Sequence, residues 1–219
     1  MVHELGRSRW TNYPIATMFL ENGYNVVSYD QRSSGENMAE YTTFGYLESH
    51  DLENCMTYLI DNIDENKKIG VFGASFGGVT VGMHLDSEQA SQNVDFAILD
   101  CPVSDMAYMI STKMEEMDMG ISVSFLMSMG DVVNKMKLGF SYEDANVCNY
   151  VSKTKVPVLV INTKENQITP YFMGEDIYNA IPHNNKRLFT VEDSKHVEID
   201  QDYPNEYEES IIDFIKQLP

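Results

Sequence analysis

The chain has few cysteines, and that shortage excludes two classes of protein. Its 219 residues include only three, Cys55, Cys101 and Cys148. They form no Cys-x-x-Cys motif and have no paired histidines nearby, as a disulfide framework or a zinc site would require. We therefore expect three reduced thiols, with no metal and no cofactor.

Basic residues and long apolar runs are also scarce. There are 15 Lys and Arg against 34 Asp and Glu, which gives a formal net charge of −19. Such a charge repels phosphate backbones and anionic membranes, so no nucleic-acid or membrane partner is expected. No apolar run reaches the roughly 18 residues that cross a bilayer, and no secretory leader opens the sequence. These features indicate a cytoplasmic protein with one domain over residues 1–219.

Short β-branched runs alternate with helical patterns along the chain. The runs predict strands at residues 24–29, 68–72, 94–99, 156–161 and 186–191. Apolar spacing predicts a helix over residues 44–63, and Pro14, Pro170 and Pro204 each begin a further helix. This alternation is typical of the α/β class, with a mostly parallel sheet covered by helices on both faces.

Residues 103–155 interrupt the alternation, because they contain no clear strand. Eight of the 14 methionines lie between Met106 and Met136. Methionine is flexible and polarizable, so this cluster suits an adaptable apolar surface such as a helical substrate lid. Filling of an ordinary helical core is the alternative.

The motif Gly73-Ala74-Ser75-Phe76-Gly77 lies between a predicted strand and a predicted helix. Small residues two positions either side of Ser75 let the chain turn sharply and hold the hydroxyl above the sheet edge. A phosphate-binding loop would need G-x-G-x-x-G or a lysine after the glycines, and neither is present. The motif therefore predicts a nucleophile elbow with Ser75 as the nucleophile.

A serine hydroxyl needs a base within hydrogen-bond reach, and His196 is the best placed of the five histidines. It follows the last predicted strand, and the carboxyl ends of parallel strands meet over one crevice. We expect the acidic residues around it to raise its pKa. These residues are Glu192, Asp193, Glu198, Asp200, Asp202, Glu206, Glu208 and Glu209.

Several segments together resemble a known family. They are an Asp-x-Arg-x-x-Gly turn within residues 29–36, the Ser75 elbow, Leu99-Asp100-Cys101-Pro102, residues 157–161 and the His196 loop. In these segments the chain resembles the serine-aminopeptidase-like and prolyl-oligopeptidase-like hydrolases of the α/β-hydrolase superfamily. The resemblance implies a Ser-His-acid triad that cleaves an ester or amide of a small molecule through an acyl-enzyme. The Met-rich lid would then select an apolar acyl group.

The third member of the triad departs from the family pattern. The resemblance places the acid after the strand at 156–161, and the matching position holds Asn166. An amide does not stabilise an imidazolium as a carboxylate does, and it favours the wrong histidine tautomer. Glu165 and Asp100 are the alternative acids, and the absence of any acid is the third possibility.

The beginning of the chain also departs from the family. The resemblance implies an oxyanion hole formed by the backbone N–H groups of Leu5 and Phe76. Residues 1–6 match only the end of the family's preceding strand, so its amino-terminal strands are expected to be missing. Two hypotheses follow: a serine hydrolase, for which esterase, peptidase and acyltransferase use the same residues, or a non-catalytic protein or truncated fragment of the same fold.

Overall fold

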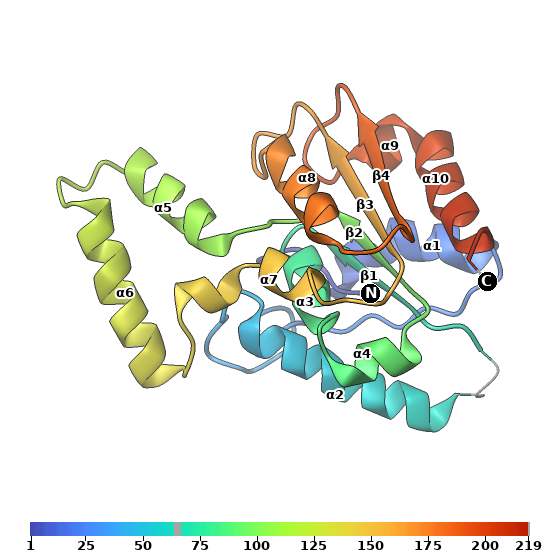
Figure 1. The fold of residues 1–219 in the computed structure, drawn as a ribbon, viewed down its shortest axis with the longest axis horizontal. Coiled ribbons are helices and arrows are strands. Elements are labelled where there is room, and N and C mark those ends of the chain that lie inside the picture. The colour runs from blue at the N-terminus through green and yellow to red at the C-terminus, as the bar shows by residue number, and fades with distance from the viewer. Residues whose placement is uncertain (64–66, 219) are drawn as a thin grey trace.

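A computed structural model describes residues 1–63 and 67–218 (Figure 1). The strands are β1 (Gly70–Ala74), β2 (Phe96–Asp100), β3 (Val158–Thr163) and β4 (Lys186–Val191). The helices are η1 (Arg9–Asn12), α1 (Tyr13–Glu21), α2 (Tyr46–Asn62), α3 (Phe76–His84), α4 (Glu88–Asn93), α5 (Met106–Glu116), α6 (Val123–Lys137), η2 (Tyr142–Ala145), α7 (Cys148–Val151), α8 (Tyr171–Ala180), α9 (Ile199–Asp202) and α10 (Pro204–Lys216).

The four strands form one parallel sheet in the order β1-β2-β3-β4. Within β2, Ala97 and Leu99 join the core on one face, whereas Phe96 and Ile98 join the core on the other. This alternation is possible because successive side chains of a strand point to opposite faces. β1, β2 and β3 are buried at nearly every position, as parallel strands covered on both faces are, whereas the edge strand β4 is only partly buried and carries Lys186, Arg187 and Thr190.

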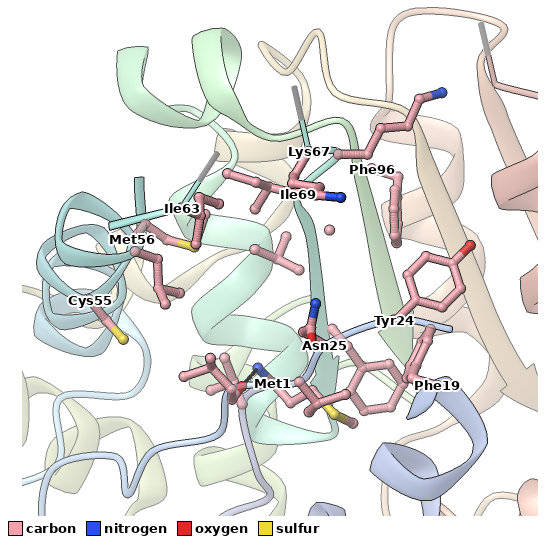
Figure 2. Close-up of a pocket in the computed structure, with 18 of the residues that line it drawn as sticks. Met1, Phe19, Tyr24, Asn25, Cys55, Met56, Ile63, Lys67, Ile69 and Phe96 are labelled. Atoms are coloured by element: carbon pink, nitrogen blue, oxygen red, sulfur yellow. Dashed lines mark hydrogen bonds between the residues drawn. The ribbon is translucent and has the colours of Figure 1, made fainter. Parts of the chain in front are cut away.

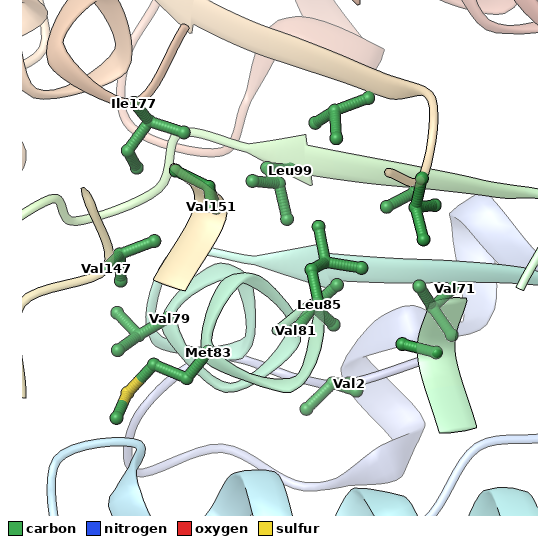
Figure 3. Close-up of a cluster of buried hydrophobic side chains, with 14 of the residues drawn as sticks. Val2, Val71, Val79, Val81, Met83, Leu85, Leu99, Val147, Val151 and Ile177 are labelled. Atoms are coloured by element: carbon green, nitrogen blue, oxygen red, sulfur yellow. The ribbon is translucent and has the colours of Figure 1, made fainter. Parts of the chain in front are cut away.

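Helices cover both faces of the sheet, as the sequence predicts. The core on one face includes buried side chains from α2, α3, α7 and α8, several of them shown in Figure 3. The core on the opposite face takes its helical side chains from α1, α9 and α10. None of the described helices is both long and apolar enough to cross a membrane.

The strand predicted at residues 24–29 does not form. The segment has no regular secondary structure, although the Met1 ammonium group donates a hydrogen bond to the carbonyl oxygen of Val27 at 2.6 Å. A strand needs a neighbouring ladder of hydrogen bonds. Residues 1–3 lie next to β1 instead, where Val2 forms one parallel bridge with Gly73.

A cavity of about 370 Å³ lies beside the amino-terminal half of β1 (Figure 2). Its lining is mainly apolar and includes Met1, Phe19, Cys55, Ile69 and Phe96. The predicted nucleophile follows the opposite, carboxyl end of β1. The cavity is therefore separate from the chemistry predicted from the sequence.

The segment predicted as a lid is helical. Residues 103–155 hold α5, α6, η2 and α7, and no strand. In Figure 1, α5 and α6 extend away from the sheet, with α6 at the edge of the molecule. We call α5, α6 and the turn between them the helical hairpin.

Candidate active site

Ser75 occupies a strained turn between β1 and α3. Its backbone has φ 52° and ψ −115°, a conformation that L-residues rarely adopt. The Ser75 N–H donates to the carbonyl oxygen of Asp100 at 2.8 Å, and the Ser75 carbonyl accepts from the N–H of Gly78 at 2.9 Å. The sheet and the first turn of α3 thus hold the strained conformation in place.

The glycines on both sides of Ser75 permit close approach of the backbone. A Cβ at Gly73 would overlap the carbonyl group of Gly77, and a Cβ at Gly77 would overlap the carbonyl oxygen of Val2. These two contacts pack the elbow against β1 and against residues 1–3. The Gly-x-Ser-x-Gly spacing is therefore a steric requirement of this turn.

His196 reaches Ser75 from the loop after β4. Its Nε2 lies 2.8 Å from the Ser75 Oγ, within hydrogen-bond reach. The loop is fixed beside Thr163, whose hydroxyl donates to the Ser194 carbonyl at 2.9 Å and accepts from the Ser194 N–H at 3.1 Å. The structure thus brings together the two residues that the sequence predicts as nucleophile and base.

Asn166 and Thr169 contact the other nitrogen of the His196 ring. The His196 Nδ1 lies 3.0 Å from the Asn166 Nδ2 and 3.2 Å from the Thr169 Oγ1. The Asn166 Oδ1 is already occupied, since it accepts from the backbone N–H groups of Ile168 and Thr169 at 3.0 and 2.9 Å. The amide must therefore turn its NH2 group, which only donates, toward the imidazole.

This amide orientation determines the favoured tautomer of His196. The Asn166 NH2 group donates one proton to the Thr169 Oγ1 at 2.8 Å, which leaves the other for the His196 Nδ1. An Nδ1 that accepts a hydrogen bond carries no proton of its own, so the ring proton resides on Nε2. In that tautomer Nε2 donates to Ser75 and cannot accept its proton.

The two alternative acids lie elsewhere. Glu165 is exposed and makes no hydrogen bond with His196 among the described residues. Asp100 points to the α10 side of the sheet, where the Tyr207 hydroxyl donates to its carboxyl at 2.8 Å. Burial raises the pKa of Asp100 to about 7. The structure therefore brings Asn166, and neither carboxylate, to His196.

A buried network positions the residues around Leu5. The His3 Nε2 accepts from the backbone N–H of Gln31 at 3.0 Å, and the Gln31 side chain accepts from the Thr80 hydroxyl of α3 at 2.6 Å. This chain of bonds ties residue 3 to the helix that begins at Phe76. Leu5 itself is 53% exposed, on the turn that follows His3.

The sequence matches the Peptidase_S9, or prolyl oligopeptidase, family over residues 10–218. This match covers nearly the whole chain. The chain belongs to the prolyl oligopeptidase family.

Individual relatives agree with the α/β-hydrolase fold. The Pyrococcus furiosus esterase Pf2001 is 26% identical with a TM-score of 0.75, and the match covers 99% of this chain and 81% of that structure. The monoacylglycerol lipase of Paleococcus ferrophilus, 15% identical with a TM-score of 0.68, shares the fold over 98% of this chain and 91% of its own. The uncharacterized protein YqkD of Bacillus subtilis (strain 168) is 24% identical over 201 residues, which are 92% of this chain and 65% of that protein. The chain therefore spans slightly less than two thirds of this curated relative.

The chain has α/β-hydrolase architecture. Burial governs the pKa of its candidate base. Burial lowers the pKa of His196 to about 4, so the prediction that the acidic rim raises it is wrong. Several of the rim carboxylates have partners of their own; Glu192, for example, pairs with Lys164, and Asp202 accepts from Ser194. A carboxylate at position 166 would have countered the burial, but an amide carries no charge.

Sequence reasoning missed Thr169 as a member of this family site. Its hydroxyl donates to the Cys101 carbonyl at 3.2 Å and accepts from Asn166, so it fixes the amide that faces His196. The spacing Asn166-Gln167-Ile168-Thr169 contains the available signal. An asparagine that accepts backbone N–H groups two and three residues later forms a local turn, and this turn places Thr169 beside the ring.

Proposed function

We propose that the chain is a serine hydrolase that cleaves an ester or amide bond through an acyl-enzyme on Ser75. The observation that carries this proposal is the 2.8 Å contact between the Ser75 Oγ and the His196 Nε2 on a strained strand-to-helix turn. Strain of this kind persists where the surrounding structure enforces it, and it is concentrated at functional sites. Family membership and the esterase relatives support the same reaction class.

The residues divide the reaction between them. The Ser75 Oγ attacks the substrate carbonyl while the His196 Nε2 takes the hydroxyl proton, and His196 then gives that proton to the leaving group. Water, activated by the same nitrogen, attacks the acyl-enzyme and releases the acid. The N–H groups of Phe76 and Leu5 are proposed to bind the oxyanion, and the loss of one such donor typically costs about 3 kcal/mol.

Asn166 makes this reaction slow. Only the tautomer with the proton on Nδ1 leaves Nε2 free to accept from Ser75. The Thr169 Oγ1, 3.2 Å from Nδ1, is the acceptor available to that tautomer. The Asn166 NH2 group opposes it, because two donors then face each other 3.0 Å apart. We therefore propose that Asn166 occupies the acid position and that Thr169 supports the minor, competent tautomer.

The substrate is proposed to carry an apolar acyl group. On the body of the molecule, Ile168 and Phe172 are exposed near Asn166 and Thr169, and the Phe172 ring meets the Tyr108 ring of α5 edge-on at 5.5 Å. Residues 103–155 act in this proposal as the lid that adds Tyr108 to the apolar rim. The three free cysteines fit the expected reducing compartment, the cytoplasm.

A fluorophosphonate probe tests the nucleophile directly. The wild-type chain should be labelled slowly and stoichiometrically, and Ser75→Ala should abolish labelling because no other activated hydroxyl replaces it. Ser124→Ala, at an exposed serine of α6, is the matched control and should react at the wild-type rate. Labelling that survives in folded Ser75→Ala would disprove the proposed nucleophile.

The second candidate function is a non-catalytic binding protein of the same fold. The observation that favours it is the amide at position 166, which holds the predominant tautomer in the form that cannot accept the Ser75 proton. The same experiment separates the two candidates. Folded wild-type protein that the probe leaves unlabelled, while Asn166→Asp becomes labelled, would establish the non-catalytic function.

A further inference from the structure

The outward face of α6 carries an apolar stripe. None of the 15 described residues of this helix is buried. Four apolar side chains nevertheless share one face, and they are 58%, 49%, 51% and 83% exposed at Phe125, Met129, Val132 and Met136 respectively. Soluble monomers seldom leave such a contiguous patch in water unless it binds something. We call these four residues the α6 seam.

The seam lies opposite the face by which α6 is attached to the molecule. A Cβ at Gly130 would overlap the Tyr142 side chain, and the Asn134 Nδ2 is buried, so these two residues mark the inner face. At 100° per residue, Gly130 and Asn134 lie more than 120° from the middle of the seam. Any closer packing of α6 on the rest of the molecule would use this inner face, so the seam would stay exposed to solvent.

The spacing of the seam is that of a helix–helix interface. Steps of four, three and four residues join its members, which is the a/d pattern of a coiled coil with Phe125 and Val132 at one kind of position and Met129 and Met136 at the other. Acyl-chain or membrane binding requires an apolar face but not this periodicity. A net charge of −19 also opposes anionic lipid surfaces.

We propose that the α6 seam binds the α6 seam of a second copy of this chain, with the two helices antiparallel. A two-fold axis midway between residues 129 and 132 brings Met129 opposite Val132 of the second copy and Phe125 opposite Met136. Every seam residue thus meets another seam residue, which is the self-complementarity that a two-fold interface demands. Antiparallel helices also place opposite dipole ends side by side.

The charges at the two ends of α6 fit this direction. Glu115, in the last turn of α5, and Asp118, in the turn between the two helices, are exposed and precede its amino end. Lys137, and Lys135 in its ion pair with Asp131, lie in its last turn. In the antiparallel pair each lysine end adjoins the acidic turn of the other copy. A parallel pair would place like charges together at both ends.

Light scattering during size-exclusion chromatography, run from about 1 to 100 μM, tests the proposal on the full chain. The wild type should approach twice the mass of one 25.0 kDa chain as concentration rises. Val132→Glu should remain at one chain throughout, because it puts a charge against Met129 of the other copy. Ser91→Glu, at an exposed serine of α4 outside the helical hairpin, should behave as wild type. Circular dichroism checks that each variant keeps its helices. Met136→Glu repeats the test at the end of the seam, where Met136 faces Phe125 of the second copy.

A charge exchange tests the direction. Lys137→Glu and Asp118→Lys should each weaken the pair about 3- to 5-fold, and the double variant should recover the wild-type dissociation constant. A wild-type chain that remains at one mass at 100 μM would overturn the proposal. So would a dimer that Val132→Glu leaves intact, or a monomer that binds phosphatidylcholine vesicles through the seam. None of these outcomes depends on whether Ser75 is catalytic.

Discussion

Helices α3 and α6 are both rich in apolar residues, but their surroundings are opposite. All nine residues of α3 are buried, whereas none of the 15 residues of α6 is. α3 lies against the sheet and begins at Phe76, directly after Ser75, while α6 lies at the edge of the molecule. The two helices therefore differ in their position in the fold rather than in their composition: α3 supports the candidate active site, and α6 presents an exposed apolar surface.

Because of this difference, substitutions in the two regions should change different properties of the protein. The geometry of Ser75 and His196 depends on α3, on β1 and on the loops after β3 and β4. Substitutions there should change turnover, pH dependence or stability. Substitutions on the α6 seam should change association and leave the other three properties alone.

The largest expected effect belongs to Asn166→Asp. A carboxylate would accept the same two backbone N–H groups through one oxygen and the His196 Nδ1–H through the other, which restores the competent tautomer. In a serine protease the reverse change costs about 10⁴ in kcat, so we expect a gain of about 10³- to 10⁴-fold here. The hydrolysis of short p-nitrophenyl esters measures it.

Two variants control this gain. Asn149→Asp adds the same charge at an exposed asparagine of α7, outside the candidate active site, and should leave kcat unchanged. Asn166→Asp combined with Ser75→Ala should lose all the added turnover. If Asn166→Asp does not increase turnover, position 166 is not the acid position.

The next effect contrasts the stability of the two helices. Val79→Ala removes two methyl groups from a side chain of α3 that is 0% exposed, and should lower the free energy of unfolding by about 2–3 kcal/mol. Val132→Ala removes the same groups from the α6 seam and should cost less than about 0.5 kcal/mol. Urea unfolding of dilute protein measures both. Equal losses would show that α6 is packed as firmly as α3.

The smallest effect is a shift in pH dependence. His196 has a pKa of about 4, so it is a neutral base above that pH, and the rate of Ser75 labelling should fall only as pH drops through about 4. Because its folded pKa lies below the ordinary 6.5, the unfolded chain binds the proton more readily. His196 therefore lowers stability as pH falls from 6.5 to 4. The rate of Ser75 labelling in Val132→Ala should depend on pH as it does in the wild type. In Asn166→Asp the labelling rate should begin to fall at a higher pH. A wild-type labelling rate that already falls at or above pH 6 would show that burial does not dominate the pKa of His196.

The sequence predicted the parts of this fold that local patterns encode. The strands at 68–72, 94–99, 156–161 and 186–191 match β1 to β4 with small differences at their ends, and the prolines correctly marked the starts of α1, α8 and α10. The elbow was predictable because a strand, two glycines and a helix start are adjacent in the chain. Residues 24–29 have the composition of a strand, but a strand depends on a neighbour that the segment itself does not encode.

The site was predictable in its residues more than in its energetics. Ser75, His196 and Asn166 each follow a strand, so the shared edge of a parallel sheet brings them together. The pKa of His196 depends on how deeply the ring is buried, and the exposure of the α6 seam depends on how the hairpin is attached. Neither quantity is a property of the residues next to it in sequence, and the role of Thr169 depends on both Cys101 and His196.

The positive φ of Ser75 has a consequence for how this sequence drifts over generations. Glycine adopts that conformation freely, so a glycine at position 75 would release strain of about 1–3 kcal/mol. Most neutral change in proteins consumes stability, but loss of this hydroxyl would add to it. Without selection for the hydroxyl, a change from Ser75 to glycine is thus favoured by folding stability. Retention of Ser75 therefore costs the folded state part of its stability.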